Sequence, residues 1–333
     1  MKGRLCLKRW RSRLPVAVLG LGLSLGVASC SNGPPALGAN FTPAAATTAG
    51  DYTLPLDSVP TSDGKTFYFT AMSNNGMGMG VYRVDAAGGA ATAVFVGAPL
   101  VSPFGIAISS DDGTLYIADS GAGHDPNDPA GDSKSGAVFS LPVGGGTPTA
   151  LPETQGLRPR GVEVTRQDNN DVVWFTGTGN DGRASVFKLA GGLQTVAAGD
   201  PLTDPGGVAI SRTGQVYVTN TAQGDSGLSS VYQVDSGTPA EIASGIRVGY
   251  PAGITTSQDG KTLLVSGQDA TLGTATVYRI NVDTREVSSI NAGLENNPDA
   301  GGLHRAKNAD VFSWCGVTVG TGGSGIVYRI EFK

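Results

Sequence analysis

The stretch Pro251-Ala252-Gly253-Ile254 begins the clearest copy of the pattern that decides the fold. Gln258-Asp259-Gly260 follows it, and then come two apolar runs, Leu263-Leu264-Val265-Ser266 and Val277-Tyr278-Arg279-Ile280. Asp followed by Gly favours the left-handed corner of a β-hairpin. Short apolar runs between such turn signals predict strands. One copy therefore predicts an antiparallel unit of short strands.

Six copies of this pattern run through the chain, and strong copies also occupy 102–119 and 205–220. A period in the forties, built from short strands and turns, is typical of a propeller blade. The sequence therefore predicts an all-β fold, a six-bladed β-propeller over residues 51–333. Besides the copy at Pro251, the other five copies start near Asp57, Gly105, Gly161, Gly207 and Gly302. Consecutive copies start 46 to 56 residues apart.

The third strand of every copy carries Tyr or Phe at one fixed position. Aromatic side chains at such a regular position favour packing in the wedge between neighbouring sheets. We therefore expect these rings to belong to the core and not to a binding site. The position is occupied by Tyr82, Phe139, Phe187, Tyr232, Tyr278 and Tyr328.

The two ends of the repeat region predict how the ring closes. The sixth copy ends at Lys333, directly after its third strand, and so lacks a fourth strand. The segment Asp51-Tyr52-Thr53-Leu54 precedes the first copy and has no blade of its own. We expect this N-terminal strand to complete the last blade, which would remove an exposed sheet edge.

The N-terminus has the three parts of a bacterial lipoprotein signal peptide, assigned to residues 1–29. Basic residues from Lys2 to Arg13 precede an apolar run that is short for a membrane span, and 27–30 resembles a lipobox. The resemblance implies cleavage before Cys30 and lipidation of Cys30, which would anchor the chain in the cell envelope. Ser31 favours the outer membrane, and residues 30–50 predict a flexible tether. The alternative is an ordinary secreted protein.

Charge and cysteine content exclude several classes of function. The formal net charge is −5, and no acidic residue occurs in the first 50 residues, so the propeller region is strongly acidic. This argues against nucleic acid as a partner. Cys315 is the only cysteine after Cys30. An internal disulfide framework and a cysteine zinc cluster are therefore excluded, and we expect Cys315 to be a buried thiol and not a nucleophile.

Two groups of residues are candidates for ligand binding at the face where the second-to-third strand loops open. Asp119 and Asn220 end second strands, and Arg160 precedes the glycine of an inner strand. They could bind a cation or a substrate, whereas the alternative for Asp119 and Asn220 is that they cap the loop backbone. Asp125, Asn127 and Asp132 alternate in a long loop and could hold Ca²⁺. The alternative there is an exposed polar loop.

Glu163 and His304 are the two weak candidates for catalysis. They lie on inner strands three blades apart, so we expect them on opposite sides of the channel and not in contact. A ligand between them could still meet both as an acid–base pair. The alternative is that both are part of a solvated channel lining.

The units 102–119 and 205–220 resemble those of NHL-type and gluconolactonase-like (senescence-marker, lactone hydrolase) six-bladed propellers. The resemblance implies the fold, and in the lactone hydrolases it implies a divalent metal held by Glu, Asn and Asp. The ligands would lie largely in the column just before the inner-strand glycine. In this chain the column has no oxygen ligand, and it consists of Leu56, Phe104, Arg160, Gly206, Ala252 and Gly301.

Three functions remain open at this point. The first is a lipid-anchored, non-catalytic envelope propeller whose loops bind a protein or carbohydrate partner. The second is a lactonase-like hydrolase of lactones or esters with a displaced site. The third is a propeller that binds Ca²⁺ for structural reasons. The first fits the anchor, the tether and the missing ligand column, since a fold alone does not carry an activity.

Overall fold

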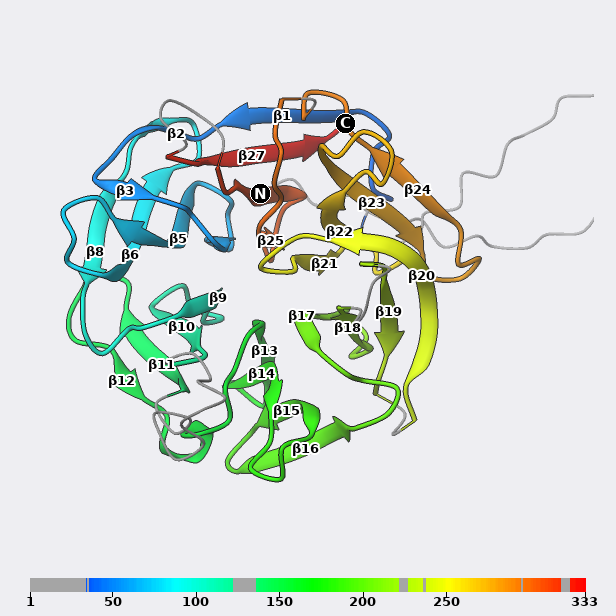
Figure 1. Cartoon of the computed structure of the whole chain (residues 1–333), viewed down its shortest axis with the longest axis horizontal. Coiled ribbons are helices and arrows are strands. Elements are labelled where there is room, and N and C mark those ends of the chain that lie inside the picture. Colours follow the sequence, from blue (N-terminus) through cyan, green and yellow to red (C-terminus); the bar gives the residue numbers. More distant parts are fainter. Residues whose placement is uncertain are drawn as a thin grey trace, which may run out of the picture. The chain divides into compact units, whose positions relative to one another are not determined.

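The first five copies of the repeat each fold into a blade of four antiparallel strands, and the sixth copy supplies three strands of the last blade; the blades are numbered 1 to 6 in chain order (Figure 1). The computed structural model describes residue 34 and residues 36–121, 136–221, 227–235, 238–294, 296–318 and 324–333. These residues belong to a unit that spans Pro34–Lys333. Within that unit the sheets follow one another around a central axis, as Figure 1 shows.

The first three blades follow the predicted strand order. Blade 1 comprises β4 (Ser58–Pro60), β5 (Thr66–Ser73), β6 (Met79–Asp85) and β8 (Thr92–Val96), with β3 (Tyr52–Thr53) paired to the end of β5. Blade 2 comprises β9 (Pro103–Ile108), β10 (Thr114–Asp119), β11 (Ala137–Pro142) and β12 (Thr149–Ala150), followed by the 3₁₀ turn η1 (Pro152–Thr154). Blade 3 comprises β13 (Val162–Gln167), β14 (Asn170–Thr178), β15 (Ala184–Leu189) and β16 (Leu193–Ala198).

The last three blades complete the ring. Blade 4 comprises β17 (Pro205–Ile210), β18 (Val216–Asn220), β19 (Ser229–Gln233) and β20 (Ala240–Val248). Blade 5 comprises β21 (Ile254–Thr256), β22 (Thr262–Gln268), β23 (Ala275–Asn281) and β24 (Val287–Ile290), and the end of β20 also pairs with β22. Blade 6 comprises β25 (Leu303–Arg305), β26 (Val311–Gly316), β27 (Ile326–Phe332) and β1 (Phe41–Ala45). The short strands β2 (Thr47–Ala49) and β7 (Gly89–Ala90) pair in parallel.

Apolar clusters join each blade to the next. Val59 of blade 1 packs in one cluster with Ile106 of blade 2, and Val138 of blade 2 packs with Val162 of blade 3. Corresponding clusters join blades 3 and 4, 4 and 5, 5 and 6, and 6 and 1. Burial of these clusters is the main driving force that holds the blades together. The pairing and the clusters are consistent with the predicted six blades.

The aromatic column of the third strands has the predicted role. Tyr82, in β6, lies in the cluster between blades 6 and 1, and Phe139, in β11, lies in the cluster between blades 1 and 2. In all six blades the ring packs in, or partly buried against, the cluster shared with the preceding blade. The other four members are Phe187, Tyr232, Tyr278 and Tyr328.

An N-terminal strand closes the ring, but it is not the predicted segment. β1 pairs antiparallel with β27 along its whole length, from Phe41 opposite Phe332 to Ala45 opposite Tyr328. The segment predicted to close the ring, 51–54, instead contributes β3, which pairs with the end of β5. Part of the predicted tether, residues 30–50, is therefore the outer strand of blade 6. Phe41 secures this strand through an edge contact with Phe332, with ring centroids 5.4 Å apart.

Removal of β1 should weaken the whole ring. We compare a chain that starts at residue 46 with one that starts at residue 36, which retains β1 and the buried Leu37. Loss of the Phe41 packing alone costs about 1–2 kcal/mol, so the shorter chain should melt at least about 2–8 °C lower. It should also self-associate through the exposed edge of β27. Equal melting midpoints and monomeric behaviour of both chains would contradict this closure.

The glycine column of the repeat marks the narrowest part of the ring. A Cβ atom built on Gly207 would lie 2.3 Å from the carbonyl oxygen of Ala252 in the next blade, and one on Gly105 would lie 2.4 Å from that of Arg160. At these two glycines, neighbouring inner strands therefore approach too closely for any side chain. In blades 1, 3, 4 and 5 a hydroxyl group of the second strand accepts the N–H of this column, as Thr219 does for Gly207 at 2.8 Å.

Gly207→Ala should destabilise the protein by roughly 3 kcal/mol or more, because the added methyl group meets backbone that cannot move aside. Gly144→Ala is the matched control, since nothing lies within 4 Å of a Cβ atom built at that position. It should change the free energy of unfolding by less than about 0.5 kcal/mol. Urea denaturation of the two variants measures both values. A small effect at Gly207 would mean that the inner strands can separate.

Candidate functional site

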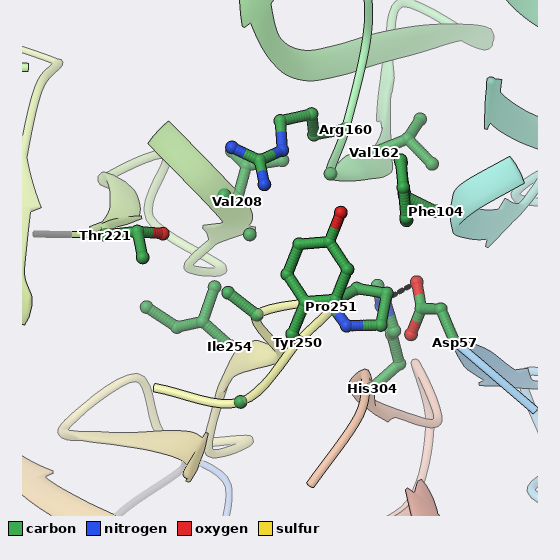
Figure 2. Close-up of a pocket in the computed structure, with 15 residues that line it drawn as sticks. Asp57, Phe104, Arg160, Val162, Val208, Thr221, Tyr250, Pro251, Ile254 and His304 are labelled. Carbon is green, nitrogen blue, oxygen red and sulfur yellow. Dashed lines mark hydrogen bonds and ion pairs between the residues drawn. The ribbon is translucent and has the colours of Figure 1, made fainter. Parts of the chain in front are cut away.

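Asp57 stands in the glycine column of blade 1, where the other five blades carry glycine. Its side chain is 4% exposed and extends into the neck of the ring. Oδ1 accepts the N–H of Ser58 at 2.8 Å, and Oδ2 accepts the N–H of Ile106, in blade 2, at 2.9 Å. Figure 2 shows the third partner, the Nε2 atom of His304, which lies 3.1 Å from Oδ2. Asp57 thus connects blades 1, 2 and 6.

His304 also contacts Glu163, which corrects the expectation that these two residues stay apart. The Nδ1 atom of His304 lies 3.6 Å from Oε2 of Glu163, three blades away. The expectation was wrong because the repeat fixes the direction of each side chain around the axis but not the width of the channel. The neck is so narrow that one imidazole ring, 6% exposed, spans from Asp57 to Glu163.

The charges of this cluster stabilise one another. Burial by itself would lower the pKa of His304, but the charge and hydrogen bond of Asp57, together with Glu163, raise it to about 10. Burial would raise the pKa of Glu163, but the neighbouring charge of His304 holds it below its usual value. The imidazolium is therefore the stable form at neutral pH, and it lies between two carboxylate groups.

A pocket opens beside this cluster, on the face of the loops that connect the second and third strands. It is about 450 Å³ in volume, counting its open mouth, and Asp57 and His304 form part of its lining. Tyr250 and Phe104 meet edge to face there, with ring centroids 5.3 Å apart. The guanidinium carbon of Arg160 lies 5.7 Å from the centroid of the Tyr250 ring. Figure 2 shows these side chains around the mouth.

Arg160 is the one predicted ligand-binding residue that lines this pocket. Its guanidinium forms an ion pair with Asp204 at the start of blade 4, and its side chain is 25% exposed. Phe104, Gly206 and Ala252, from the same column of the repeat, also line the pocket. The column that holds metal ligands in the resembled hydrolases therefore supplies a guanidinium, an aromatic ring and small residues here.

Asp119 and Asn220 are at strand ends but outside this pocket. The carboxylate of Asp119 accepts the N–H groups of Val101, Ser102 and Gly121 at 2.7 to 3.0 Å. Burial raises the pKa of Asp119, although these hydrogen bonds oppose the rise. Asn220 Oδ1 accepts the N–H groups of Thr203 and Asp204, both at 3.0 Å. Both side chains thus cap the backbone that leads into an inner strand.

Cys315 is fully buried in the cluster between blades 6 and 1. Burial raises the pKa of its thiol well above the usual value, so the thiolate nucleophile is not accessible. The predicted Ca²⁺ ligands Asp125, Asn127 and Asp132, and the predicted lipidation site Cys30, lie outside the described residues.

The described residues contain neither a metal-ligand cluster nor a membrane-spanning helix. No three His, Cys, Asp or Glu side chains in this part of the chain converge in a way that could hold a metal ion. Asp57, His304 and Glu163 do not converge, because the imidazole lies between the two carboxylates. No helix in the same part of the chain has the length and hydropathy of a membrane span.

Solved structures provide the comparison with known proteins. The aldose sugar dehydrogenase of Streptomyces coelicolor, solved with PQQ bound, superposes with a TM-score of 0.62 at 13% identity, over 89% of this chain and 99% of that one. Regucalcin of Agrobacterium tumefaciens, a calcium-binding protein, gives 0.56 at 13%, over 87% and 98%. A candidate gluconolactonase gives 0.58 at 14%, over 89% and 93%. The chain is a β-propeller.

At such low identity the likeness shows the fold alone. No protein-family model matches the chain, and no curated protein is similar enough in sequence to match it. The likeness to gluconolactonase-like propellers therefore agrees with the resemblance seen in the sequence at the level of architecture. The activity of this propeller has to be argued from its own side chains.

The sequence reasoning missed two residues of the site. Asp57 aligns with the glycine column. A charged residue at a position that is glycine in the other five copies is the signal that could have identified it. Tyr250 precedes Pro251, which opens an inner strand, and it is 56% exposed at the pocket mouth. Its position just before a strand carried no periodic signal, because it belongs to a connection between blades.

The His304 cluster should make stability fall at alkaline pH. The pKa of His304 is about 10 in the folded protein and 6.5 in the unfolded chain, so its contribution is complete below pH 6.5 and is lost as the pH rises through 10. The unfolding free energy of the wild type, minus that of His304→Gln, should therefore fall by a few kcal/mol over this range. Urea titrations at pH 6, 8 and 10 measure it. A difference that does not depend on pH would refute the ion-pair assignment.

Proposed function

We propose that this protein is a binding module of the bacterial cell envelope, and that a partner protein docks on the face that carries the Tyr250 pocket. The observation that carries the proposal is the protonation state of His304 together with the carboxylates on both sides of its ring. Both of its nitrogens face carboxylates and it is protonated at neutral pH. A general base needs a free lone pair and a pKa near the working pH, and this imidazole has neither.

The side chains at the pocket mouth favour docking of a protein. Tyr250 and Phe104 offer aromatic surface, and Arg160 beside them offers hydrogen-bond donors. Tyr and Arg are the residues that most often dominate the energy of protein interfaces. Asp57 and His304 close the inner end of the pocket, so a partner would insert a side chain and would not pass through. A carbohydrate that stacks on Tyr250 is the other outcome that the experiment distinguishes.

The anchor is a second part of the proposal and rests on the sequence. Lipidation of Cys30 would keep the propeller at the membrane, in the outer membrane if the cell is Gram-negative. The chain between Cys30 and the buried Leu37 is short, so the propeller would stay close to the lipid surface. A partner of this module would therefore be another component of the envelope.

A lactonase-like hydrolase is the second candidate, and one observation favours it. The Asp57–His304 pair lines the pocket, where a protonated imidazole could donate a proton to a substrate. The structural likeness to a candidate gluconolactonase agrees with this alternative only at the level of fold. With a pKa of about 10, however, His304 would be a weak general acid at neutral pH.

Photo-crosslinking in cells tests the docking face. A benzophenone side chain at position 250 of the full chain should give one discrete protein adduct, and the additional substitution Phe104→Ala should abolish it. Position 287 is the matched control, because Val287 is 39% exposed at the start of β24, opposite Ile280, and so lies at the end of blade 5 that faces away from the Tyr250 pocket. No adduct is expected there.

Three results would overturn the proposed function. One is equal adducts at positions 250 and 287, which would indicate random contact. Another is saturable binding of the purified protein to an envelope polysaccharide, lost in Tyr250→Ala, without any protein adduct. The third is lactone hydrolysis by the purified protein that His304→Gln abolishes, which would establish the hydrolase instead.

A further inference from the structure

A second and larger pocket opens at the opposite mouth of the channel, where the inner strands end. It is about 1150 Å³ in volume, counting its open mouth. Its walls come from the ends of β13, β17, β21 and β25 and from the turns that follow them, which surround the centre of the ring in Figure 1. It shares no residue with the Tyr250 pocket.

The lining of this second pocket is strongly cationic in an otherwise acidic protein. Arg166, Arg212, Arg305 and Lys307 line it, and Glu163 is its only lining carboxylate. Glu163 already faces the imidazolium of His304 at 3.6 Å. The formal net charge of the whole chain is −5. Four cations in one concave site are therefore a local reversal of the charge of the molecule.

Neutral groups hold the two inner cations in place. Arg305 donates from Nε to the carbonyl of Thr256 at 2.7 Å and from Nη1 to the carbonyl of Ala306 at 2.6 Å. Lys307 donates to the carbonyl of Ile108, two blades further around the ring, at 2.7 Å. Carbonyl groups orient these side chains but do not cancel their charge.

Within the part of the chain that the structure describes, none of the four cations belongs to an ion pair. Asp310 acts on Arg305 through its charge without forming an ion pair with it. The carboxylates near Lys307 bond to backbone groups. Asp171 accepts the N–H of Ser110 at 3.1 Å, and Asp112 accepts the N–H of Ser62 through both oxygens at 2.9 and 3.0 Å. These two carboxylates affect Lys307 only through their charge, which raises its pKa.

The burial of Arg305 and Lys307 disfavours the charged forms of both side chains. Burial lowers the pKa of Lys307 and that of Arg305, and this effect outweighs the opposing charges of nearby carboxylates, Asp310 and Glu163 at Arg305 and Glu163 first at Lys307. The charge of Arg212 adds a smaller lowering at Arg305. Like charges held close together and partly out of water gain most from an anion placed between them. Guanidinium groups in particular match the geometry of carboxylate and phosphate oxygens.

We propose that this second pocket binds a small anion that carries a phosphate or carboxylate group, with Arg305 and Lys307 at its base and Arg166 and Arg212 at its rim. The site is on the other side of the channel from the proposed docking face, and it does not depend on the function proposed for that face. Arg166 and Arg212 are exposed, so they can meet the ligand without any rearrangement of the core.

Calorimetric titration of the purified full-length protein, at constant ionic strength, tests the site. Inorganic phosphate and citrate are the two probes, because they separate phosphate from carboxylate recognition. At least one should bind saturably. The double variant Arg166→Gln/Arg212→Gln should weaken that binding about 10-fold or more, as expected for the loss of charge-assisted hydrogen bonds. Both residues lie at the rim, so the fold should survive, and the melting midpoint checks this.

Lys261→Gln is the matched control. Lys261 is an exposed cation that follows the turn after β21, on the same face, but it does not line the pocket. Its loss should leave binding unchanged. Absence of saturable binding of both probes would overturn the proposal. So would an equal loss of affinity in Lys261→Gln and in the double variant, because binding would then follow only the overall charge.

Discussion

The close approach of the inner strands at the neck of the ring is the constraint on which the rest of this structure depends. Five blades carry glycine there. In four of them a Cβ atom would overlap the backbone of the next blade, and in blade 6 it would overlap the side chain of Asp57. Blade 1 instead places Asp57 there. Its carboxylate must then enter the channel, where burial requires partners for both oxygens. The N–H of Ser58 supplies a partner for Oδ1, and the N–H of Ile106 and the ring of His304 supply partners for Oδ2.

This single departure from the repeat divides the channel into two unlike mouths. The imidazolium of His304, between Asp57 and Glu163, separates a mouth lined by aromatic rings from a mouth lined by cations. Buried ion pairs contribute little net stability compared with apolar packing of the same volume. Apolar clusters at the blade junctions already hold the ring together. We therefore infer that the charged cluster separates the two sites and that its contribution to the fold is secondary.

The sequence predicted the blades well because each depends on local information. Alternating strands, turn residues and the aromatic column recur in every copy. The closing strand was placed about ten residues too late because β1 contains Pro43 and two alanines, which have weak strand propensity. Proline is tolerated there because β1 is an outer strand, paired with β27 on one side only. The contact of Glu163 with His304 depends on the channel width, which a repeat does not encode.

Asp119 and Asn220 show why polar residues at repeat positions are ambiguous when only the sequence is known. Both occupy the strand end where a ligand site was conceivable, and both are fully engaged with backbone N–H groups of the preceding connection. The connection fixed by Asp119 leads into β9, which itself carries Phe104 to the pocket mouth, and the connection fixed by Asn220 contains Asp204, the ion-pair partner of Arg160. Their effect on binding is therefore indirect. They hold the backbone from which the exposed side chains of the pocket reach a partner.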